Sequence, residues 1–302
     1  MVELVCPRDR GALRDWACEY GHTYEEIEGI PLLVTDDVPT HAACGGRERL
    51  PPPVEGIDPF VQEVIAATCG NLYRHLTTDL PSYPIPELRL PPGDGATFLE
   101  VGSNWGRWCV AAARRGYRPT GVDPSLRGLQ AARRVAERMG VDVQYVVADA
   151  RHLPFADASF DVVFSYSVFQ HFTKRDALVS FDELARVLRP GGTSLIQLAN
   201  VWGARSLFHQ VLERRFREPR TLFDVRYWGP HELRDALAER IGPTELRADG
   251  FLTLNPQPTD LELLPRKYRV LVRSSELLRR ASDHVRPLTY AADSLYALST
   301  RE

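Results

Sequence analysis

The 302-residue sequence lacks several features that mark particular classes of protein. No apolar run is long enough to cross a bilayer, and the first residues, MVELVCPRDR, lack the charged-then-apolar pattern of a secretion signal. The five cysteines are an odd number, which argues against a disulfide framework in a chain of this size. We therefore expect a cytoplasmic protein with no membrane contact.

Neither sign of charge is in large excess. The 37 basic and 40 acidic side chains leave a net charge of −3, which gives no overall attraction to nucleic acid. Arginine-rich stretches such as RRFREPR keep nucleic acid open as a partner, although solvated helix faces often look the same. The length allows a full α/β core with a smaller appended unit. Nothing in the sequence indicates the oligomeric state.

The most informative stretch is FLEVGSNWGRW, which predicts a buried strand, a turn of small residues and a helix start. Gly102 and Gly106 leave room where the backbone bends or approaches a ligand, and the N–H groups from Ser103 to Gly106 are expected to face outward. Asn104 replaces the middle glycine of the dinucleotide fingerprint, which favours a ligand without a pyrophosphate. Glu100 would repel a phosphate and pair with a cationic group, which suits S-adenosylmethionine. The alternative is a purely structural corner.

A regular alternation of strands and helices follows this turn. The strand in TGVDPS places Asp123 about twenty residues beyond the turn, where an acid binds ribose hydroxyls. The strand VQYVVAD leads to Asp149 and Ala150, where a carboxylate can accept a hydrogen bond from an adenine amine. A fourth strand ends near Ser165, which we also place among the cofactor-binding residues. The pattern predicts an α/β fold, a doubly wound and mostly parallel seven-stranded sheet with ligands at the carboxyl ends of its strands.

These motifs together resemble the class I S-adenosylmethionine-dependent methyltransferases over roughly residues 97–302. LEVGSNWG is similar to the family's first motif, GVDPS to its ribose-binding acid, VVADARHLPFADASFDVVFS to its adenine-binding and fourth-strand motifs, and LARVLRPGG to the segment before the fifth strand. The resemblance implies a Rossmann-like methyltransferase fold in which residues 102–106 surround the methionine portion of the cofactor. It also implies that Asp123 binds the ribose, that Pro124 lies beside the adenine ring, and that Asp149 lies with Ala150 at the adenine edge.

Residues 1–38 have a pattern of their own. Cys6 with Asp9 and Cys18 with His22 form two ligand pairs on turns separated by a short stretch of chain, and GIPLLV supplies a closing strand. Two such pairs on facing turns build a zinc ribbon. The unit resembles the small zinc ribbon of some methyltransferases, including bacterial enzymes that methylate guanine in large-subunit ribosomal RNA, in which a cysteine occupies the position of Asp9. Zinc also accepts a carboxylate oxygen, with lower affinity than a third thiolate.

The alternative for this unit is a ribbon without metal. It would be held by three aromatic residues, Trp16, Tyr20 and Tyr24.

The remaining segments are assigned by composition. The glycine- and proline-rich residues 39–58 predict a linker, residues 59–96 a helical cap, and residues 97–302 the methyltransferase domain with an acceptor-pocket insertion at about 201–240. Three polar cap residues either touch the ligand or face solvent, Tyr73, Arg74 and His75. Seven ring-bearing residues of the insertion either line an apolar slot for a flat substrate or belong to the core, which is the commoner outcome for any one of them: Trp202, Phe208, His209, Phe216, Phe223, Tyr227 and Trp228.

Methyl transfer from a sulfonium needs an acceptor atom held in line behind the methyl group and, for a hydroxyl acceptor, removal of its proton. His171, directly after the fourth strand, is the candidate general base; its alternative role is to stabilise the loop. The leading hypothesis is transfer to an oxygen or nitrogen of a small molecule, such as a secondary metabolite. The alternatives are an rRNA base methyltransferase and a non-catalytic cofactor-binding partner subunit.

Overall fold

The computed structural model describes residues 2–35, 50–68, 80–215, 225–252 and 257–302. The chain divides into two compact units, Met1–Phe164 with Arg186–Gly192, and Ser165–Ala185 with Thr193–Glu302. Strand β6 (Phe160–Tyr166) begins in the first unit and ends in the second. None of the helices in the described ranges is both long and apolar enough to span a membrane.

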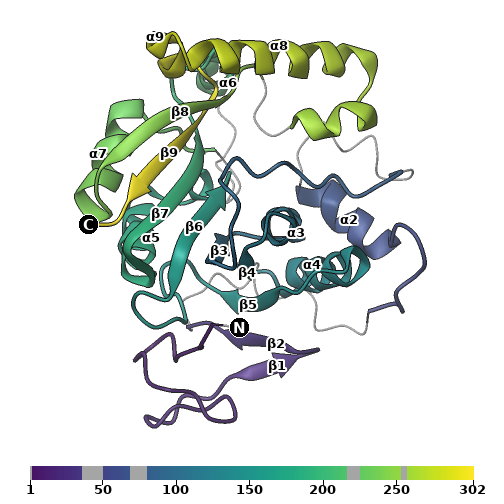
Figure 1. Cartoon of the computed structure of the whole chain (residues 1–302), viewed down its shortest axis with the longest axis vertical. Coiled ribbons are helices and arrows are strands. Elements are labelled where there is room, and N and C mark those ends of the chain that lie inside the picture. Colours follow the sequence, from purple (N-terminus) through teal and green to yellow (C-terminus); the bar gives the residue numbers. More distant parts are fainter. Residues whose placement is uncertain (1, 36–49, 69–79, 216–224, 253–256) are drawn as a thin grey trace. The chain divides into compact units, whose positions relative to one another are not determined.

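The first unit holds the predicted ligand-binding motifs. Its strands lie in the order β1-β2-β5-β4-β3-β6, and the pairs β2–β5, β5–β4 and β4–β3 are parallel. Helices α3 and α4 follow β3 and β4 in the βα alternation that the sequence predicts (Figure 1). The elements with their bounds are β1 (Glu25–Ile27), β2 (Ile30–Leu33), α2 (Pro59–Thr68), β3 (Thr97–Val101), α3 (Arg107–Arg114), β4 (Arg118–Asp123), α4 (Leu126–Met139) and β5 (Gln144–Ala148).

In the second unit the order is β7-β9-β8, and β9 is antiparallel to both neighbours. The division between the units also crosses α5 and β7. Residues 186–192, which end α5 and begin β7, are assigned to the first unit, and the rest of both elements to the second. The elements are η2 (Phe169–His171), α5 (Lys174–Val187), β7 (Leu188–Ala199), α6 (Ala204–Arg215), α7 (Pro230–Arg240), β8 (Thr244–Gly250), η3 (Pro258–Leu263), α8 (Arg266–Ser282), α9 (Arg286–Tyr290) and β9 (Ser294–Thr300). The mostly parallel α/β fold expected from the sequence is confirmed.

Local sequence explains where helices α4 and α7 begin and where α4 ends. The side chain of Ser125 accepts a hydrogen bond from Gly128 N and caps α4, and Gly140 ends α4 with a φ of 64°. Helix α7 begins with Pro230 at its first position, and Glu232 accepts a hydrogen bond from Gly229 N.

The N-terminal hairpin is part of the same sheet as the motif-bearing strands. Strand β1 pairs antiparallel with β2, and β2 pairs parallel with β5. Ile30 and Leu32 pack into a core cluster with Leu126, Leu129 and other buried residues of α4 and β5. In the described residues the sheet thus has nine strands, two more than the seven predicted for it, because the pairing of β2 with β5, far away in the sequence, cannot be inferred from local pattern.

The predicted linker and cap lie partly outside the described residues. Within them, α2 rests on α4: the guanidinium of Arg134 lies over the Phe60 ring, 4.9 Å from its centroid, and also binds Asp58 Oδ2 at 2.7 Å. The cap residues Tyr73, Arg74 and His75 fall outside the described ranges, as do Phe216 and Phe223 of the insertion.

Candidate functional site

The turn after β3 is left-handed at three positions. Gly102, Asn104 and Gly106 have φ values of 79°, 45° and 77°. Asparagine is among the few residues that tolerate this region, so Asn104 can stand where a glycine is usual. Gly106 has no substitute, because a Cβ there would lie 2.5 Å from the Tyr145 hydroxyl and 2.8 Å from Ala132 Cβ.

The expectation that the N–H groups of this turn face outward is wrong. Ser103 N donates to Val122 O at 3.0 Å and Gly106 N donates to Ser103 O at 2.8 Å. Asn104 N donates to Asp123 Oδ2, and Trp105 N donates to Oδ1 of Asn104, both at 2.9 Å. The backbone donors of the turn are therefore satisfied within the protein, which leaves the shape of the turn and the neighbouring acids as its features for a ligand.

Asp123 ends β4 beside this turn, as the sequence predicts. Its two carboxylate oxygens accept hydrogen bonds from Asn104 N and Ser125 N, at 2.9 and 2.8 Å. Burial raises its pKa to about 6 and outweighs these two bonds, which lower it. A carboxylate has about four lone-pair sites, so Asp123 retains capacity for ribose hydroxyls. Pro124 follows it and is half-buried.

Glu100 lies within β3 and is only 2 % exposed. Its Oε2 accepts a hydrogen bond from Cys109 N at 2.8 Å, so the side chain caps the first turn of α3. Burial raises the pKa of Glu100 to about 8, although the Cys109 hydrogen bonds and the charge of Arg107 lower it. At neutral pH this carboxyl is therefore mostly protonated.

Asp149 and Ala150 follow β5 and are both buried. The Asp149 carboxylate forms a two-pronged pair with the Arg151 guanidinium, with the closest contact, from a terminal guanidinium nitrogen to Oδ2, at 2.6 Å. The same carboxylate accepts a hydrogen bond from Arg151 N at 2.8 Å. Arg151 thus fixes the acid that the sequence places at the adenine edge.

In the second unit, Ser165 is fully buried and His171 is half-buried at the end of η2. The backbone around His171 is held by Arg226: Arg226 N donates to Gln170 O and the Arg226 guanidinium donates to His171 O, both at 2.7 Å. The imidazole Nε2 lies 3.5 Å from Gln170 Nε2. This predicted base therefore stands on a well-fixed loop.

A buried polar network in the second unit was not predicted from the sequence. Asp249 Oδ2 accepts hydrogen bonds from the Tyr166 hydroxyl at 3.0 Å, from Gln197 Nε2 at 3.0 Å and from the Ser294 hydroxyl at 3.1 Å. Gln257 Nε2 in turn donates to the Tyr166 hydroxyl at 2.8 Å. Tyr166 ends β6, and Ser294 pairs with Ala199 at the end of β7, so the network lies at the carboxyl ends of these strands.

The ring-bearing residues of the insertion divide into core and surface. Trp228 is 2 % exposed and packs against Phe181, with ring centroids 5.8 Å apart. Trp202 and Phe208 are each 61 % exposed, whereas Tyr227 and His209 are half-buried. Trp228 is thus a core residue, and the exposed rings belong to the loop before α6 and to α6 itself.

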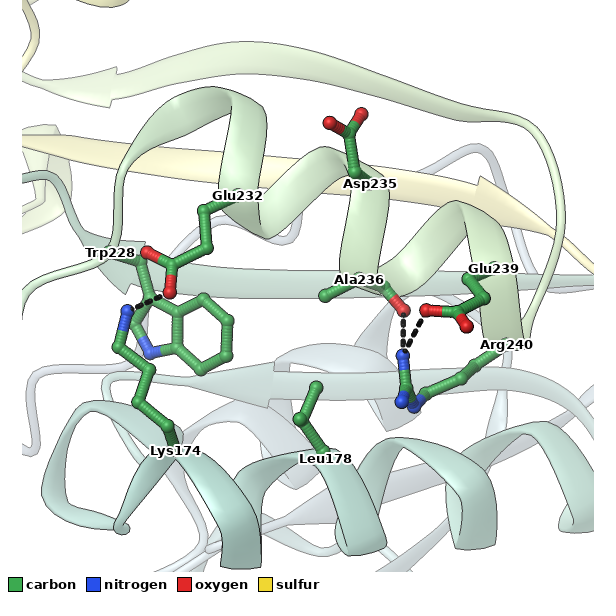
Figure 2. A pocket seen from close by; sticks show the side chains of 8 residues that line it. All are labelled: Lys174, Leu178, Trp228, Glu232, Asp235, Ala236, Glu239 and Arg240. Carbon is green, nitrogen blue, oxygen red and sulfur yellow. Dashed lines mark hydrogen bonds and ion pairs between the residues drawn. The ribbon is translucent and has the colours of Figure 1, made fainter.

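A groove of about 330 Å³ lies between α5 and α7 of the second unit (Figure 2). Lys174 Nζ lies 4.1 Å from the centroid of the Trp228 ring and pairs with Glu232. At the other end of the groove, Arg240 bonds Glu239 at 3.0 Å. Because both cations have anionic partners, we assign this groove no part in the chemistry.

The N-terminal residues Cys6, Asp9, Cys18 and His22 converge on one point. Their ligand atoms all lie within 4.8 Å of one another. His22 Nδ1 is 2.7 Å from Asp9 Oδ2, 3.4 Å from Cys18 Sγ and 3.6 Å from Cys6 Sγ. Two sulfurs, an imidazole nitrogen and a carboxylate oxygen in a cluster of this size match a tetrahedral Zn²⁺ site.

The local chain around these four residues supports their ligand role. Burial alone would raise the pKa of Asp9, but hydrogen bonds from the Cys18 thiol and Gly11 N outweigh it and lower the pKa to about 2. The Tyr24 hydroxyl lies 3.0 Å from Cys6 Sγ, as a partner outside the ligand set. A Cβ on Gly11 would lie 2.8 Å from Asp9 Oδ1, so a side chain there would displace this ligand. Cys6, Cys18 and Cys109 are free thiols in the part of the chain described.

Comparisons with known proteins point to one family. Residues 99–196 match the family model described as a methyltransferase domain. An uncharacterised methyltransferase of Mycobacterium sp. (strain JLS) is 40% identical over 111 residues, which are 37% of this chain and 41% of that protein. The ubiquinone biosynthesis O-methyltransferase of Brucella anthropi is 30% identical over 109 residues, 36% of this chain and 43% of the relative.

A crystal structure of a protein from Pyrococcus horikoshii aligns with a TM-score of 0.48 at 18% identity, over 69% of this chain and 82% of that one. The chain spans about two fifths of the length of the curated relatives it matches.

Proposed function

We propose that this chain, whose residues 99–196 match a methyltransferase domain, is a class I S-adenosylmethionine-dependent methyltransferase that transfers a methyl group from S-adenosylmethionine to an oxygen or nitrogen of a small molecule, such as a secondary metabolite. The observation that carries the proposal is the left-handed turn after β3 with a buried acid at the end of each neighbouring strand, Asp123 after β4 and Asp149 after β5. In open α/β sheets, ligands bind at these carboxyl ends.

The residues around this turn fit the cofactor. Gly102, Asn104 and Gly106 shape the turn for the methionine portion. Asp123 accepts hydrogen bonds from the ribose hydroxyls, and Asp149 accepts one from the adenine amine. Ala150 and Pro124 supply apolar contact for the ring. When bound, S-adenosylmethionine would supply a sulfonium methyl group, which the acceptor atom would take in line as the carbon–sulfur bond breaks and S-adenosylhomocysteine leaves.

On the acceptor side, His171 is proposed to take the proton from an acceptor hydroxyl. Its backbone carbonyl is held by Arg226, so the imidazole starts from a fixed loop. Oxygen is the acceptor element named for the Brucella relative, which supports oxygen over nitrogen for this chain.

A two-stage experiment tests this function. Calorimetric titration with S-adenosylhomocysteine is expected to give one site per chain, weakened at least about tenfold by Asp123→Ala through loss of a charge-assisted hydrogen bond. Transfer of labelled methyl from S-adenosylmethionine is then measured on small-molecule and RNA fractions of bacterial extracts. Label in the RNA fraction, or cofactor binding with no transfer to any fraction, contradicts the small-molecule proposal.

We also propose that Cys6, Asp9, Cys18 and His22 bind one Zn²⁺ ion. The mixed sulfur, nitrogen and oxygen ligand set and its spacing suit zinc better than calcium or magnesium, which prefer oxygen ligands only. Metal analysis of the purified chain is expected to give one zinc per molecule, and His22→Ala is expected to lose it while His284→Ala, at an exposed histidine of the second unit, retains it. Zinc content near zero in protein purified without chelator overturns this assignment.

A further inference from the structure

The hairpin that follows the proposed metal cluster pairs with the strand that leads into the proposed cofactor site. Strand β2 of the N-terminal hairpin pairs with β5 through Leu32 opposite Val147 and Leu33 opposite Ala148. Ala148 directly precedes Asp149, the acid assigned to the adenine edge. The hairpin that follows the metal cluster is therefore the direct support of the strand that carries this acid (Figure 1).

A second contact joins the metal cluster to the loop after β5. Leu4 forms an antiparallel bridge with Phe155, and Val5 N donates to Pro154 O at 3.0 Å. The next residue along the chain is the metal-ligand candidate Cys6. Residues 149–155, which include Asp149 and Ala150, are thus held at one end by β5 and at the other by the two residues that lead into the cluster.

The cluster segment has little apolar material with which to fold by itself. Among residues 2–24 the buried apolar side chains are Val5, Cys6, Pro7 and Cys18, and the two cysteines are ligand candidates. A segment of this size with only two buried apolar side chains besides its ligand candidates depends on a bound metal for its structure. The position of Leu4 and Val5 against the loop therefore depends on the metal, although Arg186 also holds the carbonyls of Leu153 and Phe155 at the far end of that loop.

From these contacts we infer that metal binding at the cluster is coupled to cofactor binding. The metal holds Leu4 and Val5 in place, and these hold residues 149–155 in the position in which Asp149 and Ala150 meet the adenine. The inference rests on the proposed methyltransferase function and on the proposed zinc site. By linkage, the coupling is reciprocal, so bound cofactor also tightens the metal.

The test compares one full-length protein with and without metal. S-adenosylhomocysteine is titrated into zinc-loaded protein, into chelated protein and into chelated protein resupplied with Zn²⁺. We expect Kd to rise about tenfold on chelation and to return on resupply, within the usual range of coupling between two sites. In hydrogen exchange, the amides of residues 149–155 should lose protection in the chelated form, whereas those of β9 should not.

A backbone variant separates the contact from the metal. Val5→Pro removes the N–H that bonds Pro154 O and keeps all four ligands, so zinc content should stay at one while cofactor Kd rises. His22→Ala should show both losses, and His284→Ala neither.

The possible failures are distinguishable. Equal Kd values with and without zinc, in protein that binds both, overturn the coupling and leave the two proposals beneath it intact. Protein that never binds zinc overturns the zinc site and the coupling with it, while cofactor binding still stands. Zinc-loaded protein that binds no S-adenosylhomocysteine contradicts the methyltransferase proposal itself.

Discussion

The backbone N–H of Asn104 donates a hydrogen bond to Oδ2 of Asp123 at 2.9 Å. The residue that replaces the usual middle glycine is thereby joined to the acid assigned to the ribose. The side chain of Asn104 also accepts hydrogen bonds from Trp105 N and from the Thr68 hydroxyl of α2, at 2.9 and 3.0 Å. The substitution thus connects the turn, the ribose acid and the last residue of α2.

Replacing Asn104 should separate backbone strain from side-chain bonding. Asn104→Gly keeps the left-handed φ but loses both side-chain bonds, so we expect about 1 kcal/mol of lost stability and a small change in cofactor Kd. Asn104→Val adds strain of about 1–3 kcal/mol and moves the N–H that bonds Asp123, so Kd should rise at least about tenfold. Denaturant unfolding and calorimetry measure the two effects. Thr68→Val, which removes one of the two bonds, is the matched control; equal Kd for the glycine and valine variants would refute the strain argument.

Glu100→Gln should change how stability depends on pH. Burial raises the pKa of Glu100 to about 8, so between its ordinary value near 4.5 and pH 8 the folded protein holds a proton that the unfolded chain has lost. This group's contribution to the unfolding free energy therefore falls as pH rises through that window, by up to about 1.4 kcal/mol per pH unit. Glutamine still accepts the Cys109 N–H but does not titrate. The variant should gain stability over wild type from pH 5 to pH 8 in urea unfolding, and a constant difference across this range would rule out a titrating Glu100.

Asp249→Ala should destabilise the second unit strongly. It leaves three buried donors, on Tyr166, Gln197 and Ser294, without their shared acceptor. We expect at least about 3 kcal/mol of lost unfolding free energy, since each unsatisfied buried group costs about 1–3 kcal/mol. Asp235→Ala, at an acid of α7 whose side chain is 64 % exposed, should cost less than about 0.5 kcal/mol. Similar losses for the two variants would mean that the network contributes no specific stability.

His171→Ala tests the proposed base. Without a group to take the acceptor proton, turnover should fall at least about tenfold, while S-adenosylhomocysteine Kd and thermal stability stay unchanged. If an imidazole takes the proton, wild-type turnover should fall as the pH is lowered, and this fall should be absent in the variant. Replacement of His284 by alanine is the control. Unchanged turnover in His171→Ala would leave this histidine with a structural role in its loop.

Local sequence predicted the βα alternation and the positions of Asp123, Asp149 and the four clustered ligands, because each depends on spacing within a few dozen residues. One boundary differs: the resemblance places LARVLRPGG before the fifth strand, whereas β7 begins at Leu188 and runs through LRPGG. Pro190 lacks the N–H that a helix would need, and Gly191 has a φ of 75°, which suits a bend at the strand start.

What the sequence could not predict depends on distant partners. The inward direction of the turn's N–H groups needs Val122 and Asp123 in place, and the buried state of Glu100 depends on how α3 packs over β3. The Asp249 network joins residues 83 positions apart in the case of Tyr166. The signal that would have found it is a lone acid in an otherwise small-residue strand end, ADG, which is weak without knowledge of the fold.

The N-terminal hairpin has a consequence for solubility as well. In the part of the chain described, β1 is the outermost strand beside β2, and it presents Glu25 and Glu26 to solvent. Two adjacent carboxylates on an open strand edge discourage pairing with a second molecule. Removal of residues 1–35 would uncover the edge of β5, whose residues Tyr145–Ala148 are all buried and carry no charge. Such a truncated protein is expected to self-associate through strand pairing, so the hairpin also keeps neighbouring molecules apart.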